Sequence, residues 1–360
     1  MNMKKLIVVF CLAIFVSSFY LCNVFAQGYE NQETQELSPE QFSDYVIQLI
    51  NNERSYKGLL TLSIDPISNL VAREYANDLV TNSYFSYCDL QGKCPDERYT
   101  DAGGSGAVVE IIKGFENYEG ENTKLTPLLA EYLIEALKVN EDDSKVFFSP
   151  FITHVGVGAA KNDLKKRLTA IVEFTTVGGT FAPLVPSVSL DEEIKVSGKV
   201  NSPFKFKAIS VAYYDQTLHY QEPNYDNFDN DYLIPYFPPQ DHIAYGSKTK
   251  ARLVKLIKTL GFIGAIGASP FTGGASAILA PVFLHSLQNA PPKEIPFEGG
   301  IKVSSNGEFN GKIPLNYQSM TGLYFVSVLA ELENIDYPVV ISRRTVVVQN
   351  PLDNALGSRR

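Results

Sequence analysis

The sequence contains no tryptophan, four histidines and four cysteines, and this scarcity limits the metal chemistry that it can support. Structural zinc sites usually take four cysteine, histidine or carboxylate ligands, often from closely spaced pairs such as C-x-x-C. The chain has no C-x-x-C pair, and no histidine lies near Cys88 or Cys94 in the sequence. These two cysteines therefore do not indicate a zinc site.

Motifs of phosphate sites and serine hydrolases are also missing. There is no Gly-x-Ser-x-Gly elbow. The GGSG stretch at 103–106 follows no predicted strand and lacks the lysine of a phosphate-binding loop. Ser-His-Asp catalysis stays open only in the formal sense that the chain has histidines. These are His154, His219, His242 and His285.

One acidic stretch, "DNFDND", offers oxygen ligands of the kind that Ca²⁺ takes. Its aspartates are Asp226, Asp229 and Asp231. The stretch lacks the glycine and the terminal glutamate that the EF-hand spacing requires. A calcium site and a solvated polar loop are therefore the two alternatives for it.

The N-terminus has the features of a secretory signal peptide. Lys4 and Lys5 precede an apolar run from Leu6 to about Tyr20, and Val24 and Ala26 occupy the small-residue positions of a cleavage site. We predict cleavage after Ala26 and a secreted, periplasmic or cell-surface protein. The alternative is an uncleaved membrane anchor.

Cleavage would leave Cys88 and Cys94 as the two cysteines of the mature chain. An oxidising compartment favours disulfide formation. We therefore predict a disulfide between them, which would restrain the short loop from Asp89 to Lys93.

The charge balance argues against nonspecific binding of nucleic acid. The formal net charge is -9, and removal of the leader takes away Lys4 and Lys5 but no acidic residue. Nucleic-acid binding of this kind needs an excess of basic side chains. The remaining length of 334 residues suggests two domains.

The chain changes character near residue 180, from helices that flank a small sheet to mainly strands. Ser38-Pro39 and Asp65-Pro66 are helix starts, and 125–139 has a helical pattern. "THVGVGAA" and "RLTAIVEFTTV" indicate two paired strands. After a stretch rich in Gly, Pro and Ser, short strands and the Asn306-Gly307 turn predict an antiparallel β-sandwich.

The predicted fold is therefore α+β, with an N-terminal α-β-α sandwich and a C-terminal antiparallel β-sandwich that carries a helical insertion. We predict a signal peptide at 1–26, a first domain at 38–180, a linker at 181–190 and a second domain at 191–350 with an insertion at 216–298.

Several separate stretches of the first domain resemble the CAP superfamily (the SCP-like extracellular domain) in its bacterial form. In chain order they are Asn51 and Arg54; Gly58 and Leu62–Pro66; Ala72 and Ala76; Tyr84–Tyr87; and "EIIKG" at 110–114 with "FITHVGVGAA" at 151–160. The resemblance covers roughly 40–178 and implies the α-β-α fold. The strands after residue 190 are similar, in a generic way, to the immunoglobulin-like modules of bacterial surface proteins.

The resemblance implies a cleft in which two histidines and acidic residues gather, and some family members bind zinc there. In this sequence the first histidine position is Tyr87, and the glutamate is kept as Glu110. The second histidine falls near Asp143, another falls at Phe151, and His154 lies on a strand. We therefore expect a remnant cleft of Tyr87, Glu110, Asp143 and His154, with no metal and no cofactor.

Within that cleft we predict a hydrogen-bonded pair between Tyr87 and Glu110. A phenol with a pKa near 10 is a weak general base at neutral pH. The alternative is that both residues only hold a loop to the domain. The family tryptophan is replaced by about Leu137.

The segment 248–288 combines a basic amphipathic stretch with about 27 uncharged residues that Pro270 and Gly273-Gly274 interrupt. Three alternatives remain for it: a buried pair of short apolar helices, a peripheral membrane contact, and a transmembrane span.

Three functions compete. The first is a non-enzymatic exported protein that recognises a protein, glycan or lipid, and the lost histidines favour it. The second is lipid or membrane binding through 248–288. The third is a weak hydrolase that depends on Glu110.

Overall fold

The computed structural model describes residues 35–116, 124–215, 233, 236–247, 254–256 and 293–350. The predicted leader, the aspartates of "DNFDND" and nearly all of 248–288 lie outside these residues. Within the described part of the chain, no helix is both long enough and apolar enough to cross a membrane.

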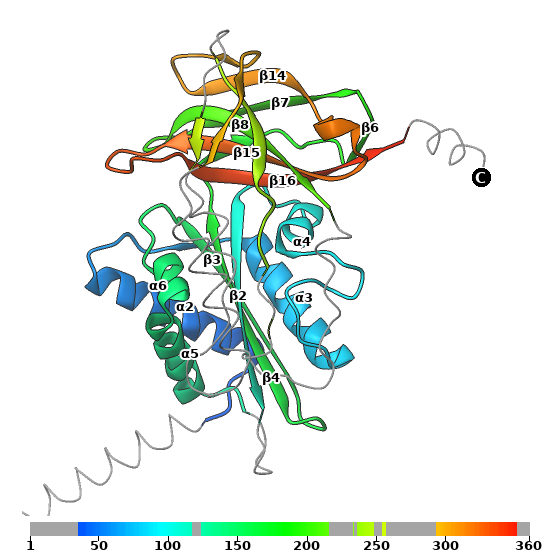
Figure 1. Cartoon of the computed structure of the whole chain (residues 1–360). Coiled ribbons are helices and arrows are strands. Elements are labelled where there is room, and N and C mark those ends of the chain that lie inside the picture. The colour runs from blue at the N-terminus through cyan, green and yellow to red at the C-terminus, as the bar shows by residue number, and fades with distance from the viewer. Residues whose placement is uncertain are drawn as a thin grey trace, which may run out of the picture.

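The N-terminal region, residues 35–176, is a four-stranded mixed sheet in the order β1-β3-β4-β2 with helices on both faces (Figure 1). Helix α3 covers one face, and α2, α5 and α6 pack on the other. The strands are β1 (Ser63–Ile64), β2 (Ala107–Glu116), β3 (His154–Asn162) and β4 (Arg167–Thr176). The helices are α2 (Pro39–Tyr56), α3 (Pro66–Asn82), α4 (Pro95–Asp101), α5 (Pro127–Val139) and α6 (Glu141–Phe147).

The helix starts predicted from the sequence are confirmed. Ser38 caps α2, and its hydroxyl accepts from the backbone of Gln41 while the Gln41 side chain accepts from Ser38. Asp65 caps α3 and accepts from the backbone N–H of Ile67 at 3.0 Å. Pro66 follows it at the first helical position.

Two glycines of "HVGVG" allow α3 to lie directly on strand β3. A Cβ atom on Gly156 would lie 2.3 Å from the backbone of Asn69, and one on Gly158 would lie 2.2 Å from the backbone of Ala72. Both distances are far below van der Waals contact. These two positions of β3 therefore exclude any larger residue.

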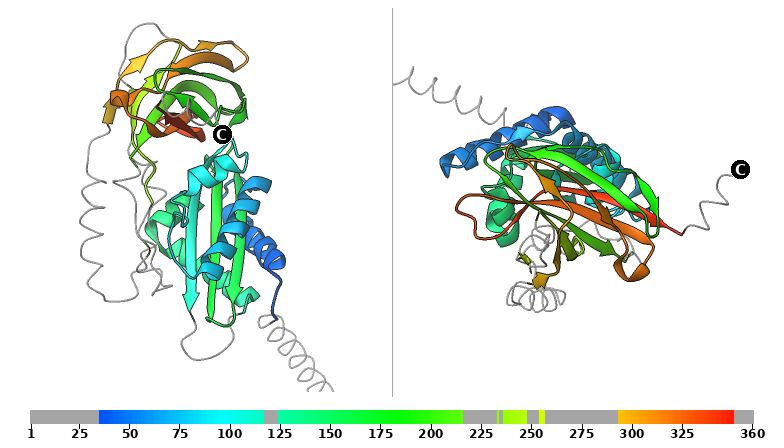
Figure 2. Two further views of the ribbon diagram at one scale, coloured as in Figure 1. Left: turned by 90° about the vertical axis from the view of Figure 1, so that its right-hand side faces the viewer. Right: turned by 90° about the horizontal axis from the view of Figure 1, so that it is seen from above.

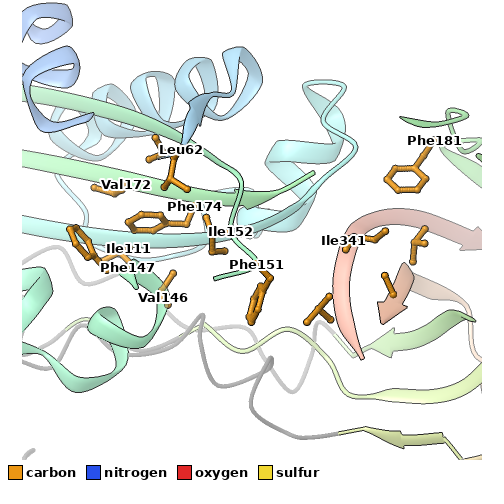
Figure 3. Packing of buried hydrophobic residues seen from close by; sticks show 14 of the residues in the cluster. Leu62, Ile111, Val146, Phe147, Phe151, Ile152, Val172, Phe174, Phe181 and Ile341 are labelled. Atoms are coloured by element: carbon orange, nitrogen blue, oxygen red, sulfur yellow. The ribbon is translucent and has the colours of Figure 1, made fainter. Parts of the chain in front are cut away.

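On the other face, aromatic and aliphatic side chains fill the space between α6 and the sheet (Figure 3). Phe147 packs edge-on against Phe174, with 6.1 Å between ring centroids, and Ile111 lies beside them. The same hydrophobic cluster continues into the C-terminal region through Phe181 and Ile341. The two regions are thus joined by packed apolar side chains.

The C-terminal region, residues 179–349, contains two further sheets. One has six strands in the order β12-β9-β8-β15-β16-β6, and one has four in the order β13-β14-β7-β5. The six-stranded sheet comprises β6 (Ser187–Ser189), β8 (Lys205–Tyr214), β9 (Asp241–Tyr245), β12 (Phe297–Glu298), β15 (Gly322–Glu331) and β16 (Val339–Gln349). The four-stranded sheet comprises β5 (Gly179–Phe181), β7 (Glu193–Val200), β13 (Lys302–Val303) and β14 (Glu308–Pro314).

Three smaller elements complete the described chain. Strands β10 (Val254–Leu256) and β11 (Lys293–Ile295) form an antiparallel pair, and η3 is a short 3₁₀ helix (Tyr317–Ser319). The Asn306-Gly307 turn joins β13 to β14, as predicted, and Gly307 adopts a left-handed φ of 85°.

The structure describes a part of the predicted insertion at 216–298. Residues 241–245 form β9, which pairs with β8 in the six-stranded sheet, and β12 pairs with β9 in turn. The alternation of apolar and polar residues in "DHIAY" is too short to stand out in the sequence. Strands from the predicted insertion thus belong to the sheet itself.

The C-terminal region sits on one end of the N-terminal region, above α4 and the adjoining ends of the sheet strands (Figure 2). Strand β16 makes this contact: the backbone N–H of Arg343 donates to the carbonyl of Gly106 at 2.9 Å. The backbone N–H of Thr345 donates to the Thr100 hydroxyl at 3.3 Å.

Candidate functional site

A disulfide loop and the short helix α4 build the candidate site. Cys88 and Cys94 are disulfide-bonded, as predicted. Between them, the carboxylate of Asp89 accepts from the backbone N–H of Lys93 at 2.8 Å and closes the loop. Pro95 then starts α4, and this helix carries Arg98 toward strand β2.

Arg98 forms a buried ion pair with Glu110. Its Nη2 donates to both carboxylate oxygens of Glu110 at 2.8 Å. The side chains of Arg98 and Glu110 are 10% and 0% exposed. Charge-assisted hydrogen bonds of this kind are among the stronger ones in proteins. The guanidinium therefore compensates the carboxylate where water cannot.

Three further groups fix the Arg98 guanidinium. Its Nη1 donates to the carbonyl oxygens of Tyr87 at 2.8 Å and Lys93 at 2.7 Å. Its Cζ lies 3.5 Å from the ring centroid of Tyr75, in cation–π geometry. The cation is thus held by strand β2, the disulfide loop and helix α3 together.

A second buried carboxyl group lies beside the first. The register of β2 and β4 places Glu110 opposite Glu173, and Glu173 is fully buried. Burial, and then the negative charge of Glu110, raises the pKa of Glu173 well above its ordinary value. Burial raises the pKa of Glu110 as well, but the Arg98 guanidinium opposes that increase, so Glu110 is the carboxyl group of the pair whose anionic form Arg98 favours.

The structure gives Glu110 a partner other than the predicted Tyr87, because its carboxylate accepts from Arg98. Tyr87 is instead 2% exposed, and its phenol lies against the backbone of Ile112. Burial raises the pKa of Tyr87 well above its ordinary value, and the nearby charges of Asp143 and Glu110 raise it further. A phenol in this setting stays protonated and cannot act as a base.

The other two residues of the expected cleft have structural partners. Asp143 forms a buried ion pair of 2.8 Å with Lys113, and burial raises the pKa of Asp143 to about 6. His154 is half-buried, and its Nδ1 lies 2.7 Å from the hydroxyl of Thr153. The charges of Glu110 and Asp143 both act on Tyr87, so these three residues lie near one another. The charge that acts on His154 is that of Asp65 instead.

These residues do not fit a zinc ion. Zinc requires deprotonated donors in tetrahedral geometry. Here the Glu110 oxygens accept from a guanidinium, and the Tyr87 phenol is protonated. In the described ranges, no group of three or more His, Cys, Asp and Glu side chains is placed to hold a metal.

The motif residues Asn51 and Arg54 also have structural roles. The Asn51 side chain exchanges hydrogen bonds with the backbone of Leu62, at 2.7 and 3.0 Å. Arg54 is fully buried and donates to the carbonyls of Phe147 and Ser149. They tie the segment after α2 to the end of α6.

The sequence reasoning missed Arg98 and Glu173. Glu173 could have been singled out from the sequence, because it is the one charged residue in the otherwise uncharged run "LTAIVEFTT". A lone charge in a buried strand needs a partner or a proton. Arg98 carried no such signal, since its stretch "PDERYTD" looks like an ordinary exposed helix.

Helix α4 also connects the site to the C-terminal region. Asp96, 1% exposed, accepts from the Tyr236 hydroxyl at 2.8 Å and lies 3.8 Å from Arg343. The sulfur of Cys94 lies 3.6 Å from the Tyr214 hydroxyl. The helix that positions Arg98 is thus fixed by residues from both regions.

Comparison with known proteins agrees with the resemblance seen in the sequence. The profile of the cysteine-rich secretory protein family (CAP) matches residues 47–176. This match supports a CAP-family domain at residues 47–176. The match covers this part of the chain and does not include the C-terminal region. No curated protein gives a significant sequence match to this chain.

Two solved structures are similar to parts of the chain. An outer surface protein from Borrelia burgdorferi is 17% identical over 39% of this chain and 97% of its own, with a TM-score of 0.33. An extracellular protein with an SCP domain from Bacillus anthracis is 19% identical over 40% of this chain and 45% of its own, with a TM-score of 0.30.

Proposed function

We propose that this chain is an exported, non-enzymatic binding protein whose CAP-family domain has a degenerate family metal site. The observation that carries the proposal is the buried contact between Arg98 and Glu110. An acid that serves in catalysis or as a metal ligand needs free lone pairs and access to substrate or water. Glu110 lacks that access, because its side chain is fully buried and each of its two oxygens already accepts from the guanidinium.

The closure of this site is built into the fold rather than formed by one flexible side chain. Arg98 is held by carbonyls, by the Tyr75 ring and by the ion pair itself, and α4 is fixed in turn through Asp96. Removal of the guanidinium would leave a buried carboxylate without a partner, which costs several kcal/mol. A hydrolase that depends on Glu110 is therefore disfavoured.

We further propose that the C-terminal region is an immunoglobulin-like β-sandwich that serves in recognition. Two sheets with a shared apolar core support this, and Phe206 of β8 stacks on Phe309 of β14 with 4.7 Å between ring centroids. Export is a part of the same proposal, supported by the N-terminal leader pattern and the Cys88–Cys94 disulfide. The partner class remains a protein, a glycan or a lipid.

The test is a hydrolysis screen of the wild-type protein beside E110Q, with ester, peptide and glycoside substrates. Gln keeps the shape of the side chain and removes its charge, and circular dichroism must first show that the variant is folded. We expect no turnover that differs between the two proteins. Turnover by the wild type that E110Q lacks would contradict the proposal and favour the Glu110-dependent hydrolase.

A further inference from the structure

The hairpin that joins β3 to β4 has an unusual tip. Leu164 is 97% exposed, the highest value among the large apolar side chains of the described residues. Single exposed leucines are common on protein surfaces and need no explanation. This one stands at the end of a β-hairpin, at the end of the N-terminal region that lies away from the C-terminal region (Figure 1).

Basic side chains surround this leucine. The stretch "KNDLKKR", 161–167, has four basic residues and one acidic residue. Lys161 is already paired with Glu36 and Asp163. Lys165 instead donates to the hydroxyl of Ser83 at 2.5 Å. Because this hydroxyl is neutral, the contact does not compensate the positive charge of Lys165. Lys165 and Lys166 thus add positive charge to the tip of a protein that is acidic overall, whereas Arg167 lies opposite Glu116 in the sheet register.

A shallow polar pocket adjoins the tip. Asn82, Ser83, Lys165 and Arg167 line it, and its volume is about 480 Å³. Amide, hydroxyl, ammonium and guanidinium donors are the groups that hold a phosphate. The hairpin thus presents an apolar side chain and an anion-binding surface side by side.

We propose that the tip of the β3–β4 hairpin is a contact site for the surface of an anionic lipid bilayer. Leu164 enters the interface between headgroups and acyl chains, Lys165 and Lys166 face the negative surface, and the pocket receives a headgroup phosphate. Basic residues beside an apolar anchor are the usual combination for such binding. The exposed leucine favours a bilayer over a soluble polyanion, which would gain nothing from it.

The hairpin includes neither Glu110 nor any residue of 248–288, so this proposal goes beyond the proposed function. If the hairpin does not bind vesicles, the hydrolysis and zinc tests of Glu110 keep their meaning. If Glu110 proves to act in hydrolysis or zinc binding, the vesicle test of the hairpin keeps its meaning too.

The experiment is co-sedimentation of residues 27–360, the chain without its predicted leader, with vesicles of phosphatidylcholine that contain or lack phosphatidylglycerol. The hairpin variants are L164S and K165E/K166E. The matched controls are L60S, at a leucine that is 84% exposed, and K195E/K199E, at two exposed lysines of β7. Circular dichroism confirms folding, and K165Q/K166Q replaces the charge reversal if that variant does not fold.

We expect the wild type to sediment with the phosphatidylglycerol vesicles only. We expect K165E/K166E to weaken this binding by on the order of tenfold or more, and L164S by about tenfold, while both controls bind as the wild type does. Failure of the wild type to bind would overturn the proposal. Equal binding by the wild type and the hairpin variants would overturn it too, and would transfer the contact to another element.

Discussion

The Nη2 atom of Arg98 lies 2.8 Å from both carboxylate oxygens of Glu110, and this contact joins helix α4 to the edge strand β2. It places a fixed cation at the acid that the CAP resemblance singles out. The charge that a bound metal would supply elsewhere is supplied here by the chain.

Replacing Arg98 with methionine should destabilise the protein by about 3–5 kcal/mol, because Glu110 then stays buried without its partner. Urea unfolding followed by circular dichroism measures this. The double variant R98M/E110L should recover much of the loss, since it removes both charges. The control is K93A, which breaks the exposed pair of Lys93 and Asp101 and should cost less than about 1 kcal/mol. A loss from R98M no larger than that of K93A would show that the pair is unimportant.

Glu97 should make the protein less stable as the pH rises. Burial raises its pKa to about 7, and the charge of Asp101 contributes to the increase. Between the unfolded pKa of about 4.3 and the folded pKa of about 7, the folded protein keeps a proton that the unfolded chain has lost. The free energy of unfolding therefore falls through this window and stays lower above it, by roughly 3–4 kcal/mol.

The variant E97Q removes this titration and should be more stable than the wild type at pH 8. Other buried acids, including Asp143 and Glu173, titrate in both proteins, so the difference between the two pH curves isolates Glu97. E74Q, at an exposed position of α3, controls for the loss of one negative charge. Parallel curves for the wild type and E97Q would show that Glu97 titrates as an exposed acid does.

Substituting Gly158 with alanine should cost about 1–3 kcal/mol or more, because the new methyl group meets the backbone of Ala72 and Arg73 at 2.2 Å. The overlap is removed when α3 and β3 move apart. The comparison is G92A, where a Cβ meets no atom within 4 Å and the left-handed φ of 81° alone opposes the change, at about 1–2 kcal/mol. Thermal unfolding ranks the two. A harmless G158A would mean that α3 does not rest on β3.

The sequence predicts local structure here better than it predicts the site. The caps at Ser38 and Asp65 and the glycines of "HVGVG" act on neighbouring residues or on one closely packed helix, so their patterns are readable in the chain. The Arg98–Glu110 contact depends on the direction in which the chain leaves the disulfide loop, because this direction brings α4 to strand β2. Its partners are twelve residues apart with no periodic pattern between them. Tertiary packing decides such a pair.

The measurement that tests the central claim most directly is calorimetric titration of the wild-type protein with Zn²⁺, beside E110Q as the control. If Arg98 fills the position opposite Glu110, the wild type shows no saturable binding that depends on Glu110, and the two titrations coincide. Binding of one zinc ion per chain that E110Q abolishes would contradict the account, because it would require Arg98 to leave the carboxylate.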